Sequence, residues 1–597
     1  MAVSPRTTAV NLDFVPAGTT VAELAGAGFS PGLMGAGLGS VPPDQTYLDI
    51  GAGNRVFSSL YDHELHPAPT DLGGCRAWFA QAVTRAESAP DEIEPGLLVE
   101  RLEEAGVAVA GEGASGCPLG IAADGSGLLG TIKKAKRGVF WVTETTLAEA
   151  TEEARQAGPH ELVIAVAAPT GEDDELPPIG IVGKGYDGDL TSDTTRTNGY
   201  VLSTDIAPTI LEFFGLAVPS QMTGQAIRSE GSVDPAGIET RAARMRVVSP
   251  RRGPVIGWSL LAWVLAAALA ALLSRGASAK PAVRLLGLSV VYLPVLLLVG
   301  AALEPAQYPE MLVVMFGAPL LGAVTLAALR DYRALAVATA VTVCAYALDA
   351  ILGSPLSALS LLGPNPLLGV RFYGIGNELE SLLAVIIVAG IGAGLAGFAP
   401  RLPPGRCAAV FLLVGLFFAA IFASGKFGAD VGAAIDFPAG VACAAVAITG
   451  GRKRWIVLVI LIPLIVVALL ALADLVTGAN SHFTRSVLDA GGLHSLGDTA
   501  QRRLEQTARS FVRPILAIML PAVAILAVVA WLQRATLARW VRDYPAMRAA
   551  LIGAVVATVT ATLANDSGAL LLEIGAAYLL VFVGWAWAEA GRKPRAA

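Results

Sequence analysis

The stretch IGWSLLAWVLAAALAALLS at residues 256–274 contains no charged residue. An α-helix rises about 1.5 Å per residue, so roughly 20 apolar residues cross a hydrocarbon core of about 30 Å. The stretch therefore predicts a membrane-spanning helix, the first of about ten or eleven along the chain. The candidate spans are residues 256–274, 284–303, 311–329, 333–353, 378–398, 406–423, 429–449, 455–475, 512–532, 547–564 and 569–588.

Composition supports a large membrane-embedded part. Hydrophobic residues make up 54% of the 597 residues, charged residues make up 15%, and the mean hydropathy is +0.61. These values predict an extramembrane domain over residues 1–250 and an all-α, multi-span domain over residues 251–597. The net charge of −7 argues against nucleic acid as a partner and leaves the lipid bilayer as the predicted one.

Loop charges predict the orientation in the membrane. Basic residues gather in alternate loops and at the C-terminus: Arg275, Lys280, Arg330, Arg333, Arg401, Arg406, Arg452, Lys453, Arg454, Arg534, Arg539, Arg542, Arg592, Lys593 and Arg595. The positive-inside rule assigns such loops to the cytoplasm, so the N-terminal domain is predicted outside the plasma membrane. Arg251 and Arg252 argue against this orientation. Residues 1–57 contain no apolar run of signal length, so we expect an export segment upstream of the given start.

The five cysteines show no metal-ligand spacing. Cys344, Cys407 and Cys443 lie in apolar spans and are interpreted as packing residues. Cys75 and Cys117 share the N-terminal domain, where a disulfide between them is one option if that domain faces an oxidising compartment.

The N-terminal domain alternates short β-like runs with helix-like segments. Residues 138–142, 161–168 and 178–182 are expected to form strands, because they are short and rich in apolar and β-branched side chains. Residues 147–156 and 204–214 are expected to form helices, the first opened by a capping box of Thr146 and Glu149. This alternation predicts an α/β domain with a parallel sheet.

The segment DTTRTNGYVLSTDIAPTILEFFGLAVPSQMTG at residues 193–224 resembles the closing segment of alkaline phosphatase-like enzymes, a superfamily of phosphatases, sulfatases and phosphoglyceromutases. In that family a strand leads into Asp-x-x-Pro-Thr-x-Leu, then a helix, Gly, Pro and a final Gly. The matching positions are Asp205, Pro208, Thr209, Leu211, Gly215, Pro219 and Gly224. The resemblance, which rests on the order of these motif residues, covers about residues 15–228 and implies an alkaline phosphatase-like fold.

The resemblance also implies a site that this chain does not match. The family holds two metals with several Asp and His residues, and this domain has only His63, His66 and His160. Ala168-Pro169-Thr170 stands where the family commonly has Asp-His-Gly, and no leading strand with its metal-binding Asp is recognised. We therefore expect no metal site and a binding or scaffolding role. The two-domain arrangement resembles uncharacterised Gram-positive envelope proteins.

Four polar segments interrupt the apolar half: RFYGIGNELE at residues 371–380, SGKFGAD at 424–430, SHFTR at 481–485 and NDSG at 565–568. Polar and charged groups at membrane depth are costly, so they usually face a cavity or a partner. In the predicted topology all four segments lie on the extracytoplasmic side. They are therefore predicted to line one outward-facing site.

Two functions fit this site. The first is an extracytoplasmic transferase or ligase acting on polyprenyl-phosphate-linked or other phosphorylated envelope intermediates. Carboxylates and imidazole would act as bases, and cations would hold a phosphate. The predicted catalytic residues are Glu378, Asp430, His482 and Asp566, and the predicted substrate-binding residues are Arg371, Asn377, Lys426, Arg485 and Asn565. No cofactor is indicated.

The alternative is a secondary transporter or a flippase for a lipid-linked substrate. Asp436, Asp566 and Glu573 would then be proton or ion sites near the membrane interior. Nucleotide-driven pumping is disfavoured, because the chain has no Gly-x-x-x-x-Gly-Lys-Ser/Thr phosphate-binding loop.

Overall fold

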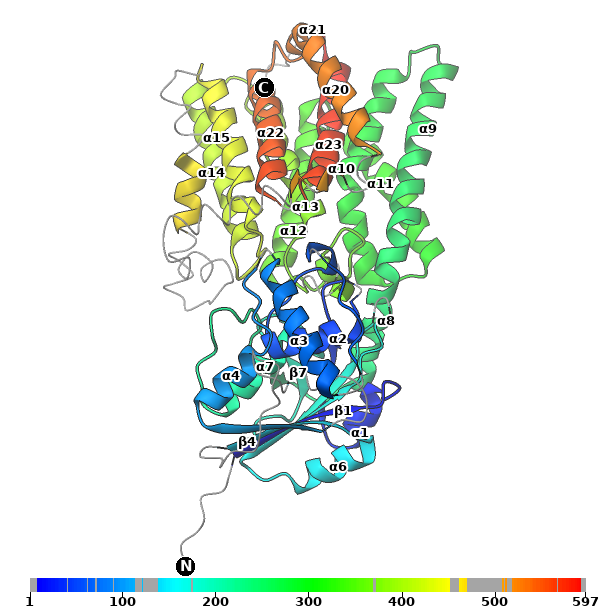
Figure 1. The fold of residues 1–597 in the computed structure, drawn as a ribbon. Helices are drawn as coiled ribbons and strands as arrows, with labels where there is room; N and C mark the ends of the chain where they lie inside the picture. Colours follow the sequence, from blue (N-terminus) through cyan, green and yellow to red (C-terminus); the bar gives the residue numbers. More distant parts are fainter. Residues whose placement is uncertain are drawn as a thin grey trace, which may run out of the picture. The chain divides into compact units, whose positions relative to one another are not determined.

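The computed structural model divides the chain into two compact units. The first comprises Met1–Arg246 together with Asn365–Phe372, and the second comprises Val247–Pro364 and Tyr373–Ala597. Each unit is described by itself below (Figure 1). The structure describes residues 8–39, 41–61, 63–69, 72–89, 91–112, 121, 138–172, 175–364, 366–368, 372–450, 461–469, 507–508, 510–512, 518–565 and 567–591.

The first unit is built on a seven-stranded sheet with the order β3-β4-β1-β5-β6-β2-β8. All neighbouring strands pair in parallel except that β6 runs antiparallel to both β5 and β2. The strands are β1 Thr8–Val15, β2 Ser30–Gly35, β3 Val107–Glu112, β4 Gly138–Glu144, β5 Glu161–Ala167, β6 Pro178–Val182 and β8 Tyr200–Leu202. The short strands β7 (Asp189–Thr191) and β9 (Arg228–Glu230) form a separate antiparallel pair. This confirms the predicted α/β class.

Helices cover both faces of this sheet (Figure 1). They are α1 Val21–Gly26, α2 Pro43–Ala52, α3 Leu72–Glu87, α4 Leu97–Glu104, α6 Leu147–Gln156 and α7 Ile206–Phe213. On β5, Leu162, Ile164 and Val166 join one hydrophobic cluster, while Val163 and Ala165 join another that includes residues of α1 and α6. Successive side chains of a strand point to opposite faces, so a strand buried on both faces reads as a continuous apolar run.

Local signals fix the start of α6. Thr146 Oγ1 accepts a hydrogen bond from Glu149 N at 3.3 Å, and Thr146 N donates to Glu149 Oε2 at 3.0 Å. These two bonds satisfy backbone N–H groups that the first helical turn cannot pair internally. The capping box predicted from the sequence is therefore confirmed.

The first strand of the sheet, β1, was not predicted from the sequence. It lies inside the sheet, where Val10 faces Phe140 of β4 and Leu162 of β5 in parallel register. Its sequence TAVNLDFV carries Asn11 and Asp13 on one face. The polar residues interrupt the apolar pattern, which explains why periodicity alone did not reveal this strand.

The second unit is a helical bundle. Eight helices of the described chain are long and apolar enough to cross a membrane: Pro235–Leu273, which ends as α9 (Trp258–Leu273), α10 Ala279–Leu303, α11 Gln307–Ala328, α12 Tyr332–Ile351, α13 Asn377–Phe398, α14 Pro404–Ala423, α22 Pro545–Ala564 and α23 Gly568–Glu589. The pair α20 (Leu520–Leu532) and α21 (Arg534–Trp540) is bent by 74° and would count as a ninth span. The protein is therefore a multi-pass membrane protein by helix length and composition.

Two other predicted spans differ from these helices. Residues 429–449 form the short apolar helix Gly432–Ile448, whose main part is α15 (Asp436–Ile448). Of the predicted span at 455–475, the structure describes only 461–469, which are helical. The Gly-rich segment before Asp436 explains the short helix, because a Gly-rich stretch favours irregular backbone.

The helix α13 is the central element of the bundle. Within its most apolar window 78% of the residues are buried, compared with 17% in α11. It contacts α12, α14, α15, α22 and α23. Polar residues at the start of α13 are therefore surrounded by other helices of this unit.

Close packing of α15 on α22 depends on small residues. A Cβ atom on Gly553 would lie 2.4 Å from the carbonyl oxygen of Gly440 and 2.9 Å from the Ala444 Cβ. Small residues allow membrane helices to approach closely, because van der Waals packing drives helix association in lipid. This packing holds α15, and the polar segment before it, in a fixed place.

Candidate functional site

Three polar segments meet at one end of the second unit. They are residues 373–381 at the start of α13, residues 428–437 at the start of α15, and residues 565 and 567–571 at the start of α23. Ile375 N donates to Gly428 O at 3.0 Å, and Ser381 Oγ donates to Leu571 O at 2.7 Å. These segments therefore lie in contact with one another within the described part of the chain.

Glu380 lies at the middle of this convergence. It belongs to the first turn of α13 and is wholly buried. Its Oε2 accepts a hydrogen bond from Asn565 Nδ2 at 2.8 Å. A Cβ atom on Gly432 would lie 1.9 Å from Glu380 Oε1, so only glycine leaves room for this carboxylate. The N-terminal position is favourable, since the helix dipole stabilises negative charge there.

Asp430 and Asp436 flank the short 3-10 turn Gly432–Ala434. Asp430 is 3% exposed, and its Oδ1 accepts from Ala433 N at 3.2 Å. Asp436 is 0% exposed, and its Oδ1 accepts from Phe437 N at 2.8 Å. Among the described residues nothing donates a hydrogen bond to Asp436 Oδ2. Glu380, Asp430 and Asp436 are called the acidic cluster below.

Glu378 is separated from Glu380 by one residue and has a different partner. Its Oε1 lies 3.1 Å from Arg252 Nη1, and Arg252 Nη2 also donates to Gly363 O at 2.6 Å. Arg251 forms a second pair with the buried Glu310, with 2.9 Å between Nη1 and Oε2. Both arginines that argued against an outside N-terminal domain are therefore neutralised by carboxylates of the second unit.

The structure brings only some of the predicted site residues together. The side chains of Asn377 and Asn565 meet, with 3.4 Å between Asn377 Oδ1 and Asn565 Nδ2. Asn377 precedes Glu378 in the chain, and Asn565 donates to Glu380. Lys426 is exposed, with its ammonium 6.0 Å from the centre of the Phe427 ring. Arg371, His482, Arg485 and Asp566 lie outside the described residues, and the single-site hypothesis stays a prediction.

Two residues of this region were not singled out from the sequence. Glu380 was overlooked beside Glu378, although a helix turns about 100° per residue and places positions i and i+2 on different faces. Ser381 was overlooked because a hydroxyl in an apolar helix carries no charge signal. Glu573, a candidate for transport, is partly buried in α23, and its Oε1 has no hydrogen-bond partner among the described residues.

In the first unit, residues that the family resemblance emphasised serve the fold. Asp205 is wholly buried and accepts hydrogen bonds from Ser192 Oγ and Thr194 Oγ1, each at 2.7 Å. It also accepts from the backbone N–H groups of Leu202 and Gln225, each at 2.9 Å. These four bonds tie two loops to the start of α7.

The acidic loop after β6 is also bound to the protein. Asp193 forms an ion pair with Arg228 at 2.8 Å, and Asp189 Oδ1 accepts from Asp234 N at 2.9 Å. Among the described residues no group of three or more His, Cys, Asp or Glu side chains is arranged to hold a metal ion.

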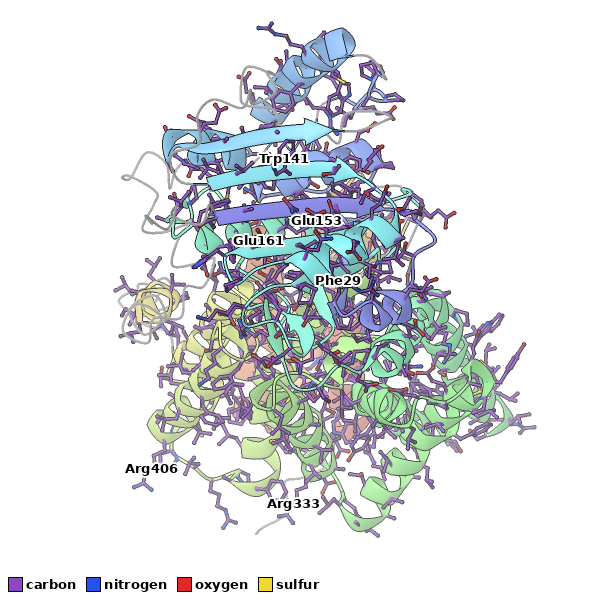
Figure 2. The ribbon with its side chains drawn as sticks, turned by 90° about the horizontal axis from the view of Figure 1, so that it is seen from below. Phe29, Trp141, Glu153, Glu161, Arg333 and Arg406 are labelled. Carbon is purple, nitrogen blue, oxygen red and sulfur yellow. The ribbon has the colours of Figure 1, made fainter. Side chains whose placement is uncertain are left out.

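Asp13 is a buried carboxyl group on β1. Burial and the neighbouring carboxylate of Glu153 on α6 raise the pKa of Asp13 to about 7. Asn11 Nδ2 donates to Glu153 Oε1, and Asp13 Oδ2 has no hydrogen-bond partner within the described chain. Figure 2 shows Glu153 over the face of the sheet. A second buried carboxyl, Asp49 on α2, has its pKa raised to about 7 by burial alone.

The cysteines divide by domain. Cys75 is disulfide-bonded, while Cys117, the partner considered from the sequence, lies outside the described residues. Cys344, Cys407 and Cys443 are free thiols. A disulfide in the first unit fits an oxidising compartment.

Comparison with known proteins assigns no family. No family model matches the chain, and neither a curated protein nor a solved structure is significantly similar to it. The resemblance to alkaline phosphatase-like enzymes therefore rests on the motif at residues 193–224 and stays a prediction.

Proposed function

We propose that the membrane half is a proton-coupled transporter or flippase for an envelope substrate, with the acidic cluster as its proton site. The observation that carries this proposal is Asp436, a wholly buried carboxyl whose Oδ2 receives no hydrogen bond from the described residues. Ionisable groups inside membrane proteins commonly mark ion pathways and proton relays, because their burial costs several kcal/mol.

Electrostatics explains why such a cluster would hold a proton. Asp436 feels the negative charge of Asp430, and both lie in the low-dielectric interior of the bundle. Two neighbouring carboxylates there cannot both ionise without strong mutual repulsion. A proton shared by the pair removes this repulsion, and access of water to the cluster would release it. Loading and release on opposite sides is the step that couples proton movement to transport.

The transferase function is the second candidate, and one observation favours it. Glu378 is 26% exposed in its side chain and has an arginine beside it, as a base next to a phosphate-binding cation would. Three features argue against it. Arg252 is already bound to Glu378 and to Gly363 O, the exposed Lys426 is the other described cation nearby, and the acidic cluster would repel a phosphate.

We also propose that the first unit faces the extracytoplasmic side of the plasma membrane. Basic residues gather in the loops at the opposite helix ends from the acidic cluster, and Arg251 and Arg252 are neutralised by Glu310 and Glu378. The disulfide at Cys75 supports the same orientation.

The test uses the full-length protein in vesicles that contain polar lipids extracted from the native membrane and an entrapped pH-sensitive dye. We expect the wild-type protein to move protons only when these lipids are present, and Asp436→Asn to abolish that movement. Glu304→Gln, at an exposed carboxylate outside the cluster, is the matched control. Proton movement by Asp436→Asn at the wild-type rate would disprove the transporter proposal. Loss of function in Glu378→Gln alone would favour the transferase.

A further inference from the structure

A second site lies at the other ends of the helices in the membrane half. A cavity of about 220 Å³ opens between the end of α11, the start of α12, the end of α13 and the segment before α22. It is far larger than the roughly 10–15 Å³ that a single water requires. Its polar lining includes Arg330, Asp331, Arg333 and Tyr544, together with the backbone around Gly397.

The two arginines give the cavity its charge. Arg330 is exposed, and no ion pair or hydrogen bond involves its side chain in the described structure. Arg333 donates from Nε to Gly397 O at 2.8 Å, and its guanidinium lies 5.6 Å from the centre of the Phe398 ring. The Nε bond and the ring fix the plane of the guanidinium and leave its terminal N–H groups without a carboxylate among the described residues. Asp331 offsets one of the two positive charges, so the lining keeps a net positive charge.

Glu589, an acidic residue near Tyr332 of the lining, is neutralised by an arginine. Glu589 is wholly buried, and its Oε1 lies 2.7 Å from Arg284 Nε. Tyr332, the first residue of α12, is buried beside the cavity and packs edge-on against Tyr544 with ring centres 4.7 Å apart. Both rings line the cavity, which lies at the ends of α11 and α13 and at the start of α12.

We infer that this cavity binds a phosphate group, supplied by the headgroup of an anionic membrane lipid. A guanidinium offers planar, charge-assisted hydrogen bonds that match phosphate oxygens. Basic pockets between membrane helices on the cytoplasmic side are suited to anionic headgroups. The N-terminus of α12 adds its partial positive charge at the same place. The cavity is named the phosphate cavity below, and it is independent of the acidic cluster.

The experiment measures lipid retention by the full-length detergent-solubilised protein with native mass spectrometry. Phosphatidylglycerol, an anionic lipid, is compared with phosphatidylcholine, which has no net charge. We expect about tenfold tighter retention of phosphatidylglycerol by the wild-type protein, because the choline cation of phosphatidylcholine offsets its phosphate charge and is repelled by the positively charged lining. Arg330→Gln should remove most of this preference and leave the Arg333–Gly397 bond intact. Arg333→Gln should also remove most of this preference, although it deletes the bond to Gly397 as well.

The control is Arg406→Gln. Arg406 is exposed and lies apart from Arg333 in Figure 2, outside the phosphate cavity. This variant should retain phosphatidylglycerol as the wild-type protein does. Addition of inorganic phosphate separates the two sources of the ligand: continued lipid retention identifies the headgroup, and displacement identifies free phosphate, which still supports a phosphate site. Equal retention of both lipids by the wild-type protein, or an equal loss in Arg330→Gln and Arg406→Gln, would overturn the inference.

Discussion

Replacement of Asp13 by asparagine should flatten the pH dependence of stability in the first unit. Burial and Glu153 raise the pKa of Asp13 from 3.8 to about 7. The folded state therefore prefers the protonated carboxyl, and the stability gained at low pH is lost as the pH rises through 7. A pKa raised by this much lowers the free energy of unfolding at high pH by about 4 kcal/mol at most, since each pKa unit corresponds to about 1.4 kcal/mol.

The Asp13→Asn variant keeps the shape of the side chain, and its amide cannot ionise. Its amide can donate to Glu153 as the protonated acid does, so the low-pH stability should change little. Between about pH 4 and pH 7, the range between the unfolded and folded pKa values, the wild-type unit should lose stability more steeply than Asp13→Asn. Asp49, whose pKa is also about 7, keeps part of the slope in the variant, and Asp13→Asn/Asp49→Asn should remove most of it.

The assay is hydrogen exchange of the full-length protein in lipid nanodiscs, followed in peptides from β1 and β5 and corrected for the intrinsic pH dependence of exchange. Glu152→Gln, at the exposed neighbour of Glu153 on α6, is the control and should behave as the wild-type protein. The reasoning is refuted if the wild-type opening free energy of these strands is the same at about pH 4 and about pH 7. It is also refuted if Asp13→Asn leaves the slope unchanged.

Two further predictions concern the membrane half and its orientation. Gly432→Ala should abolish transport and reduce the yield of folded protein, because the added Cβ would lie 1.9 Å from Glu380 Oε1. Size-exclusion profiles would measure the yield of folded protein. The control is Gly394→Ala, which should behave as the wild-type protein because nothing lies within 4 Å of its added Cβ. In intact cells an impermeant maleimide should label Lys184→Cys and spare Arg406→Cys, both introduced in a cysteine-reduced background. Labelling of Arg406→Cys alone would reverse the proposed topology.

The sequence predicted the features that depend on local pattern. Apolar runs of spanning length predicted the helices of the second unit, and the capping box at Thr146 and Glu149 predicted the start of α6. It did not reveal β1, because Asn11 and Asp13 face an internal partner, Glu153, that lies far along the chain. A polar side chain whose burial is compensated by a residue far along the chain leaves no recognisable pattern in the local sequence.

At the candidate site, too, some features were predictable from the sequence and others were not. Polar residues in apolar surroundings predicted that the starts of α13, α15 and α23 carry a site. The pairing of Glu378 with Arg252 was not predictable, because it depends on which turn of each helix meets the other. The importance of Glu380 depends on Gly432, a contact between residues on separate segments that only the folded chain brings together.

The segment Asn365–Phe372 has a consequence for how the protein can be divided. It belongs to the first unit although the chain on both sides of it belongs to the second, and Phe372 lies 5.6 Å from the buried Tyr200 ring of β8. The backbone therefore passes between the units three times, at residues 246–247, 364–365 and 372–373. A gene truncated after residue 250 would encode a domain without Phe372, with the Tyr200 ring newly exposed to solvent. Secreted versions of the domain should therefore carry residues 365–372 as a grafted loop or a peptide added in trans.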